Sequence, residues 1–599
     1  MSANLIPEEV GGERLTGEQS AYLEGLFAGV KNRGVSFGDV EPGAGPASEK
    51  KKKVTPEEKI KADLNPLDAL PLLRADAREN RAPEKENVFR YKWNGLFWLA
   101  PVHEGYMCRL RIPGGVVTSE QVRELANISD DIASGYLQIT TRNNFQVRVV
   151  QPKDTPELLR RIQDCGLQSR GSGADNLRNF TSNPTAGIDA HELVDVLPLV
   201  RDLAHEVING LEFYDLPRKY NISFDGGGMV GVAEDTNDIG MRAVELEAAP
   251  EGHRLHGKLE AGVYFQVLLG GVTGHEEFAE HSGVICRPEE AVDVVTAMTR
   301  VYVEHGNRGN RGKARLVYLL KDWGFEKFLE ATEEKLGWDL MRFDAEADAA
   351  DGALVVVREK PAVPHPHLGA HAQRQEGLNY LGVYVPVGIL PSEQARGLAA
   401  IAEEYGSGEL RLTIWQNLII PNIPDEKLEA AKAAVLEAGL DFRASMVRGA
   451  VAACTGNRYC KYASSDTKGH SMELVDFLDE RMALDDPINI HVTGCPHSCA
   501  QHYIGDIGLL ACKVKRGEES LEGYHVFVGG GFGANKRLGR QLFKSVVAGE
   551  ELNRLVLAML EGFMEKREEG ERFLDFVTRH EEAALVEMTE ARMAAGGIA

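Results

Sequence analysis

The amino-acid sequence predicts an α+β protein in which two copies of a half-domain are combined with two larger mixed α/β domains. Three observations support this prediction: a gapless internal repeat, alternating strand and helix periodicities within each copy, and a length of 599 residues, too long for one core. The expected segments are an N-terminal extension at 1–60, a half-domain at 61–175, an α/β domain at 176–345, a linker and second half-domain at 346–445, and an α/β domain with a helical C-terminal tail at 446–599.

The internal repeat relates residues 113–167 to residues 386–440. At a constant offset of 273, 16 of the 55 aligned positions are identical. Each copy is read as strand, helix, strand, helix, and we expect Ser119 and Ser392 to cap the first helix of each copy. Two such copies predict ferredoxin-like α/β sandwiches related by a pseudo-two-fold axis. Because cofactor pockets are common at domain interfaces, we expect a site between the copies.

The repeat also serves as an internal control for three arginines of the first copy. These are Arg109, Arg142 and Arg148. Their counterparts in the second copy are uncharged, namely Gly382, Trp415 and Pro421. Because the second copy needs no cation at these places, we interpret the arginines as ligands of an anion. The alternative is that they are ordinary surface arginines.

Further cations follow the first copy in Gly- and Asn-rich segments. They are Arg178 in ADNLRNFTSNP, Arg218 and Lys219 (with the neutral Asn221) in DLPRKYN, and Arg308, Arg311, Lys313 and Arg315 in GNRGNRGKARL. Turns of this kind suit carboxylates or phosphates, onto which arginine forks with two hydrogen bonds. The net charge of −24 argues against nucleic acid or an anionic membrane as partner. An anionic ligand must therefore bind in a local basic pocket.

Four of the eight cysteines form two close pairs, C-x5-C and C-x3-C. They are Cys454, Cys460, Cys495 and Cys499. Four thiolates are a soft ligand set that suits an iron–sulfur cluster or zinc. Zinc pairs usually have two to four residues between the thiols, so the first spacing favours a cluster. Buried structural cysteines are the other alternative. Glycine turns at Gly456 and Gly494 could point backbone amides at sulfur.

The strings ACTGNRYC and HVTGCPHSCAQHYIGDIG resemble the cluster-binding signature of the sirohaem-containing nitrite and sulfite reductases. The resemblance runs from about Asn65 to about Leu555. It implies that the four cysteines bind a [4Fe–4S] cluster and that Cys499 bridges to the sirohaem iron. The catalytic residues implied by resemblance are Arg109, Arg178, Lys219 and Asn221. The implied anchors of the sirohaem carboxylates are Arg142, Arg148, Arg218, Arg311, Lys313 and Arg315.

The activity implied by this resemblance is the assimilatory six-electron reduction of nitrite to ammonium. Nitrite-reducing members of the family tend to have Asn at the position of Asn221, where sulfite-reducing members tend to have Lys. The segments LPRKYN, GSGELRLT and IIPN also resemble those of ferredoxin-dependent nitrite reductases. Sulfite reduction to sulfide is the alternative. A non-catalytic iron–sulfur or zinc protein is a more remote one, which would leave the arginines of the first copy without a role.

The electron donor is expected to be another protein, by resemblance a ferredoxin. The segment VFVGGGFGAN meets a relaxed dinucleotide-binding pattern, but no second strand follows the next helix, so we interpret it as a tight turn. No flavin domain is evident. The N-terminus lacks a signal or transit pattern, and we expect a cytoplasmic monomer. We interpret the histidines at 365, 367 and 371 as part of a flexible linker, and the Lys50–Lys53 run as a solvated one.

Overall fold

The computed structural model describes residues 9–10, 13–14, 16–17, 54–344, 348 and 354–595. The chain forms two compact units, Met1–Lys53 and Val54–Ala599. In the smaller unit, β1 (Glu9–Val10) pairs antiparallel with β2 (Glu13–Arg14). The Lys50–Lys53 run and most of the expected extension lie outside the described residues. The larger unit begins before residue 60, with helix α2 (Pro56–Asp63).

Two five-stranded sheets form the half-domains, and each sheet contains one strand of the other copy. The first sheet runs in the order β17 (Ile389–Pro391), β6 (Tyr136–Ile139), β7 (Phe145–Val150), β4 (Tyr106–Arg109) and β3 (Leu96–Trp98). The second runs in the order β15 (Gly369–Ala372), β16 (Leu378–Val383), β19 (Leu418–Pro424), β18 (Glu409–Leu412) and β5 (Val116–Thr118). Since β17 pairs with β6 and β5 pairs with β18, the exchange is reciprocal. This symmetry confirms the predicted duplication.

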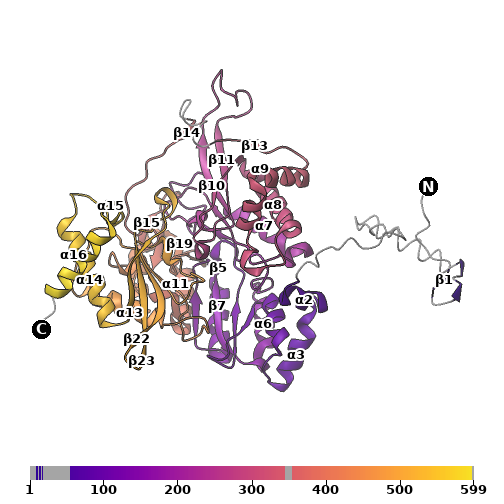
Figure 1. Cartoon of the computed structure of the whole chain (residues 1–599), viewed down its shortest axis with the longest axis horizontal. Coiled ribbons are helices and arrows are strands. Elements are labelled where there is room, and N and C mark those ends of the chain that lie inside the picture. The colour runs from indigo at the N-terminus through magenta and orange to yellow at the C-terminus, as the bar shows by residue number, and fades with distance from the viewer. Residues whose placement is uncertain are drawn as a thin grey trace. The chain divides into compact units, whose positions relative to one another are not determined.

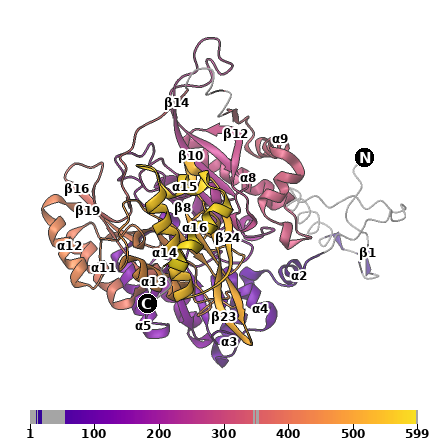
Figure 2. The ribbon, with the colours of Figure 1, turned by 60° about the vertical axis from the view of Figure 1, so that its left-hand side comes forward.

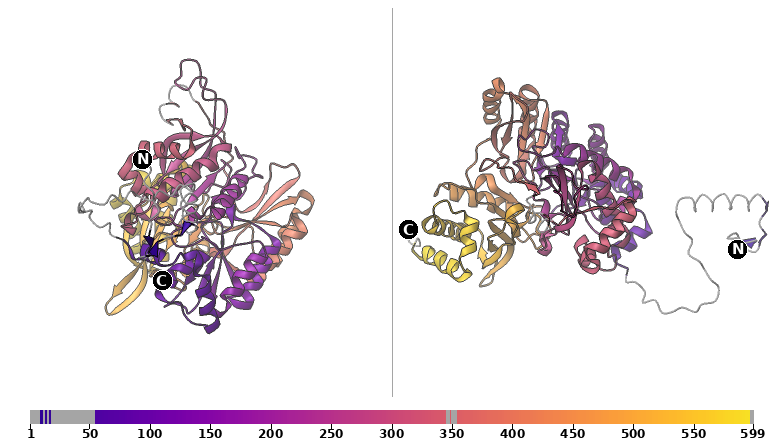
Figure 3. Two further views of the ribbon diagram at one scale, coloured as in Figure 1. Left: turned by 90° about the vertical axis from the view of Figure 1, so that its right-hand side faces the viewer. Right: turned by 90° about the horizontal axis from the view of Figure 1, so that it is seen from above.

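Four helices of the half-domains pack on these sheets. They are α5 (Ser119–Ile132), α6 (Thr155–Asp164), α11 (Ser392–Tyr405) and α12 (Leu428–Glu437). Helices α5 and α11 lie against each other, and one hydrophobic core, which includes Leu125 and Leu398, runs through both copies. Figure 3 shows the purple first copy beside the salmon second copy.

The predicted serine caps are wrong by one residue. Thr118 caps α5 in a capping box with Gln121, and the N-cap of α11 is Pro391, which makes no side-chain capping bond. Ser119 is already helical, and its hydroxyl donates instead to the Glu403 carboxylate at 2.8 Å. The serine thus joins the two copies.

The two larger domains are built on sheets with a common strand pattern. The first comprises β8 (Thr181–Ser182), β9 (Ile222–Asp225), β10 (Ile239–Leu246), β11 (Gly262–Leu269) and β12 (Glu280–Cys286), with β13 (Met341–Arg342) and β14 (Val355–Val356) added. The second comprises β20 (Val451–Ala453), β21 (Ile490–Thr493), β22 (Ile507–Arg516), β23 (Glu519–Val528) and β24 (Arg540–Val547). In both, the first three strands are parallel and the next two antiparallel. The duplication therefore extends beyond the half-domains.

Helices cover these sheets and complete the larger unit (Figures 1 and 2). Near the first sheet lie α7 (Leu197–Asn209), α8 (Ala291–His305) and α9 (Leu316–Leu336). Near the second sheet lie α13 (Thr467–Asp479), α14 (Glu550–Lys566), α15 (Phe573–Arg579) and α16 (Glu582–Ala595). Before the first copy come α3 (Leu70–Glu79) and α4 (Lys85–Arg90). Across the described ranges, no helix is both long and apolar enough to cross a bilayer.

Two segments with ambiguous sequence patterns have plain structural roles. The glycine-rich run after β23 is a turn that leads into the antiparallel strand β24. The predicted flexible histidine linker is wrong for all three histidines. The Nε2 atoms of His365 and His367 contact the carbonyl oxygens of Ser445 and Gly449, each at 3.1 Å, and His371 lies in strand β15, paired with Tyr380. His367 is only 6% exposed, and burial lowers its pKa to about 3. His367 is therefore a buried, neutral ring, and His365 lies half-buried beside it.

Candidate functional site

One part of the site is a buried hydrogen-bond network around Asp238, which immediately precedes β10. Arg315 donates two hydrogen bonds to its carboxylate, at 3.0 and 2.6 Å, and the Asn221 backbone N–H donates a third at 2.8 Å. With the Asn221 amide oriented to satisfy its surroundings, its oxygen accepts from Arg315 at 3.2 Å and from Arg142 at 3.0 Å. Asn221 is thus fixed between two arginines, which come from different domains.

Three other predicted residues are cations that form no ion pair in the part of the chain that the structure describes. Arg178 donates only to backbone carbonyls, including that of Ala174 at 2.9 Å. Burial lowers the pKa of Arg178 well below its usual range, and the nearby Arg109 lowers it further. Burial also lowers the pKa of Arg109 to about 10 and, with Arg315, that of Lys219 to about 7. Arg178 is buried, and Arg109 and Lys219 are half-buried. Cations removed from solvent without counter-ions are costly unless an anion binds among them.

The position of these cations relative to the cysteines is also defined. The Cys499 thiol opposes the lowering of the pKa of both Arg109 and Lys219, so it lies within electrostatic range of both. The Thr141 hydroxyl, beside Arg142, donates to the Cys499 carbonyl oxygen at 3.1 Å. The cations come from the first half-domain and the first α/β domain, and Cys499 comes from the second α/β domain, so three domains contribute to this part of the site.

The four predicted cluster ligands converge at one end of the second α/β sheet. They are Cys454, Cys460, Cys495 and Cys499. Strands β20 and β21 are parallel and end just before Cys454 and Cys495. Burial raises the pKa of Cys495 to about 12, and the three other thiols, which lie within electrostatic range, raise it further. The Gly494 N–H donates to the Cys454 sulfur at 3.1 Å, as the glycine turn predicted.

In a mononuclear zinc site four thiolates share one ion. A [4Fe–4S] cluster instead takes one thiolate on each of four irons. Backbone amides directed at sulfur and partial burial also suit a cluster, so the residues fit this group.

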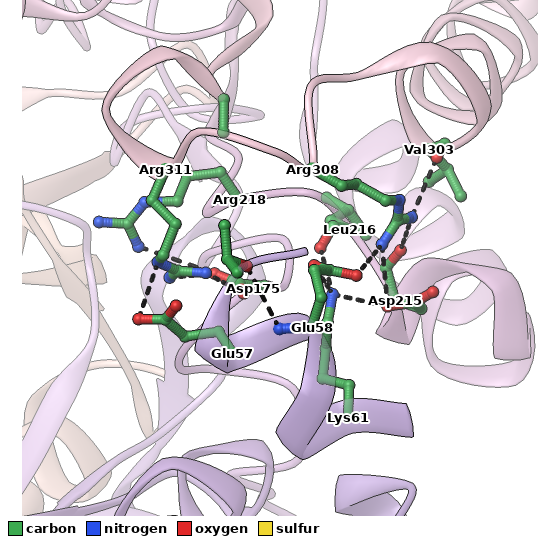
Figure 4. A network of polar contacts seen from close by, with 12 residues as sticks. Glu57, Glu58, Lys61, Asp175, Asp215, Leu216, Arg218, Val303, Arg308 and Arg311 are labelled. Atoms are coloured by element: carbon green, nitrogen blue, oxygen red, sulfur yellow. Dashed lines mark hydrogen bonds and ion pairs between the residues drawn. The ribbon is translucent and has the colours of Figure 1, made fainter. Parts of the chain in front are cut away.

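Arg218 and Arg311, two predicted carboxylate anchors, lie around the fully buried Asp175 (Figure 4). Arg311 forks onto the Asp175 carboxylate with two hydrogen bonds of 2.8 Å, while Arg218 approaches it at 3.7 Å. Lys313 is exposed and makes no ion pair in the described part of the chain. Because Arg311 already uses two N–H groups on Asp175, Arg218 and Lys313 keep more N–H donors available for a ligand than Arg311 does.

Helix α2 is attached to the same basic loop by ion pairs (Figure 4). Glu57 lies 3.3 Å from Arg311, and Glu58 accepts a hydrogen bond from Arg308 at 3.1 Å. Part of the basic cluster that the sequence indicates is therefore used to fasten this helix. Such contacts between residues about 250 positions apart carry no local sequence signal.

Arg148 lies on the cluster side of the first half-domain. Its guanidinium donates to Gln138 and Gln146, each at 2.5 Å, and to the Thr455 hydroxyl at 2.8 Å. Thr455 directly follows the first cysteine of the cluster motif. The contacts that the structure gives Arg148 thus lead to the cluster loop, and its predicted bond to a sirohaem carboxylate stays a prediction.

Two aspartates of the site, Asp175 and Asp238, were missed in the sequence, although they pair with Arg218, Arg311 and Arg315. A signal for Asp238 does exist. The pair Asn221 and Asp238 recurs at an offset of 268 as Asn489 and Asp506. Each aspartate is the first residue of an Asp-Ile-Gly string. In the second pair the Asn489 N–H again donates to the aspartate, at 2.9 Å.

Convergent thiols beside uncompensated buried cations define an iron–sulfur protein with an anion site. A protein-family model described as "Nitrite and sulphite reductase 4Fe-4S domain" matches residues 173–340 and 446–595. A second family model, described as "Nitrite/Sulfite reductase ferredoxin-like half domain", matches residues 101–165 and 371–438. These ranges cover both half-domains and both α/β domains.

Individual relatives cover most of the chain. Ferredoxin–nitrite reductase of Synechococcus elongatus is 35% identical over 468 residues, 76% of this chain and 86% of that protein. Sulfite reductase [ferredoxin] 2 of Mycolicibacterium paratuberculosis is 32% identical over 506 residues, 83% of this chain and 87% of that protein. The solved structure of the Mycobacterium tuberculosis NirA protein superimposes with a TM-score of 0.79 at 29% identity, covering 89% of this chain and 98% of the other.

The chain belongs to the nitrite and sulphite reductase family. It is accordingly an oxidoreductase, and membership implies a [4Fe–4S] cluster together with a sirohaem.

Proposed function

We propose that this enzyme reduces nitrite to ammonium in nitrate assimilation, with electrons supplied one at a time by reduced ferredoxin. The observation that carries the proposal is a group of three cations that form no ion pair among the described residues, the buried Arg178 and the half-buried Arg109 and Lys219, with Cys499 within electrostatic range of the last two. Relatives named ferredoxin–nitrite reductase support the substrate and the donor.

The bound cofactors would supply an iron with an open face and low-potential electrons. We propose Cys454, Cys460, Cys495 and Cys499 as the cluster ligands. Arg142, Arg218 and Lys313 are the anchors of sirohaem carboxylates that we favour on geometry, because Arg311 and Arg315 already fork onto aspartates. The predicted anchoring roles of these two arginines and of Arg148 are untested.

The protein's own residues have three tasks in the reaction. Arg109 and Arg178 hold the oxygens of the bound anion and balance the charge that builds up on them. Lys219 carries a proton on Nζ, and its lowered pKa of about 7 makes it a better acid than an exposed lysine. Asn221, fixed by Arg142 and Arg315, adds a neutral hydrogen bond.

Sulfite reduction is the second candidate, and it is supported by the relative named sulfite reductase. The residue that argues against it is Asn221, whose amide oxygen faces two arginines. A lysine at this place would add a charge that suits a dianion such as sulfite better than monoanionic nitrite.

The first experiment is a visible absorption spectrum of the purified protein with iron counted on the same sample. We expect sirohaem bands and about five irons per chain, four from the cluster and one from the sirohaem. A colourless or zinc-containing protein would contradict the proposal. Turnover of nitrite and of sulfite with reduced ferredoxin then decides between the two substrates.

The substitution Asn221→Lys tests the basis for substrate choice. We expect the ratio of sulfite to nitrite turnover to rise about tenfold, equivalent to about 1.4 kcal/mol of discrimination. We also expect lower nitrite turnover, because the new cation faces Arg142 and Arg315. If the ratio does not change, Asn221 does not determine the substrate.

A further inference from the structure

A buried lysine, Lys468, is bonded to the strand that precedes the first cysteine of the cluster motif. It is the second residue of α13 and is 9% exposed. Its ammonium donates to two backbone carbonyl oxygens, those of Val387 and, at 3.4 Å, Ala453. It forms no ion pair with any carboxylate among the residues the structure describes. A buried ammonium bonded only to neutral carbonyls is costly, so its charge calls for an explanation.

The residue at the equivalent place in the first α/β domain is not a cation. There, α7 packs on the turn at 113–115 of the first copy, as α13 packs on the corresponding turn at 386–388 of the second. The contact to the first turn is made by the apolar Leu197, so close to Gly114 that a Cβ there would lie 2.7 Å from the leucine. The shared scaffold therefore needs no charge at this position, and the lysine is particular to the domain that carries the cysteines.

The backbone that receives the lysine is strained. Val387 has φ of 43°, in the left-handed region that β-branched residues rarely adopt. Its counterpart in the repeat, Gly114, has φ of 66° and no side chain to oppose that conformation. The hydrogen bond from Lys468 holds the Val387 carbonyl oxygen in this unusual position. Backbone strain of this kind persists where the surrounding contacts hold the residue in its unfavourable conformation, and such residues are often found at functional sites.

The second carbonyl partner of Lys468 connects it to the cluster. Ala453 is the last residue of β20 and immediately precedes Cys454. It is also fixed by Gln416 of the second copy, which accepts from its N–H at 2.9 Å and donates to its oxygen at 3.0 Å. Thr467, the residue before Lys468, donates to the Cys454 carbonyl oxygen at 2.8 Å, so the start of α13 is bonded to the first cysteine of the cluster motif. Burial lowers the pKa of Lys468 to about 7, and the Cys454 thiol opposes this lowering.

We propose that Lys468 is a positioning residue for the cluster, which holds the strand end before Cys454 and makes the cluster easier to reduce. Reduction adds one negative charge to the cluster, and a buried cation nearby stabilises the reduced form more than the oxidised form. Because the ammonium is shielded from solvent, its effect is screened less than that of a surface lysine. The inference rests on the proposed cluster.

The test is a reductive titration of the holoenzyme, followed by electron paramagnetic resonance of the reduced cluster, with iron counted on each sample. Lys468→Gln keeps a donor for the carbonyls and removes only the charge. We expect it to retain its iron, while the ratio of reduced to oxidised cluster at a fixed potential falls about tenfold, equal to a shift of about 59 mV for one electron. Lys468→Arg, which keeps the charge, should restore most of the ratio.

The matched control is Lys461→Met, which removes an exposed lysine directly after Cys460. We expect it to change the ratio less than about twofold, because solvent screens its charge. Lys468→Met removes both charge and hydrogen bonds, so it should also release iron faster into a chelator. An unchanged ratio in iron-loaded Lys468→Gln, or an equal change in Lys461→Met, would overturn the inference. A wild-type protein without iron would instead overturn the proposed function.

Discussion

The two α/β domains share one strand pattern and one Asn–Asp pair, yet they surround that pair differently. In the first domain Asp238 accepts two hydrogen bonds from Arg315, while Lys219 lies two residues before Asn221. In the second domain Asp506 forms no ion pair with any residue the structure describes, and burial raises its pKa to about 6. At the offset of 268, Pro487 stands where the first domain has Lys219.

The two half-domains also differ in charge at equivalent positions. Arg142 donates to Asn237 at 2.9 Å and reaches Asn221, whereas its counterpart Trp415 packs against aromatic rings, including Phe532 at 5.3 Å between centroids. One half of the duplicated molecule supplies cations and the other supplies thiols. A residue that differs between otherwise equivalent positions is thus a better guide to function than charge or burial alone.

The largest expected effect is on turnover, from Arg109→Gln. Loss of a cation proposed to hold the anion should lower nitrite turnover roughly tenfold to a thousandfold while the sirohaem spectrum is kept. The measurement is kcat with a chemical reductant, to exclude effects on donor binding. The matched control is Arg396→Gln in the second copy, whose arginine is paired with Asp130 at 2.7 Å on the surface. Equal losses in both variants would show that the copies do not differ in function.

The second effect is a difference in the stability of the protein when each of the two aspartates is replaced by asparagine. Asp238→Asn leaves buried Arg315 without its partner and should lower the free energy of unfolding by about 3–5 kcal/mol. Asp506→Asn should be at least as stable as the wild type at pH 7. Because the folded pKa of Asp506 is raised, wild-type stability falls as pH rises from about 4 to 6, and the variant lacks this fall. Denaturant unfolding of both apo-proteins at pH 4, 5 and 7 measures the difference.

A destabilised Asp506→Asn variant at pH 7 would show that the second carboxylate is ionised and stabilising, as the first is. The two domains would then not differ in the way their structures indicate.

The smallest effect concerns the caps of the equivalent helices α5 and α11. Gln121 and Gln394 both donate to a carbonyl oxygen at the end of the following helix, at 3.1 and 3.0 Å. Only Gln121 also accepts from an N-cap, the Thr118 N–H at 3.0 Å. Gln121→Ala should therefore cost about 0.5–1 kcal/mol more than Gln394→Ala in thermal unfolding. Equal costs would mean that the capping box adds nothing.

Much of the fold and the site could be predicted from the sequence because the signals are local. Spacing alone selected Cys454 and Cys499, and the gapless repeat predicted the half-domains. The strand exchange could not be predicted, because β5 and β17 have the same alternating pattern whichever sheet they join. Asp175 was missed for a similar reason, since its partner Arg311 lies 136 positions later.

The reciprocal exchange of β5 and β17 has a consequence for synthesis of the chain. Strand β6 lacks a neighbour on one edge until Ile389–Pro391 has left the ribosome. Until then the first sheet presents an open edge, which can pair with other chains. Neither copy can form its complete five-stranded sheet alone, so a chain cut between them would yield two fragments, each missing a strand that the other carries.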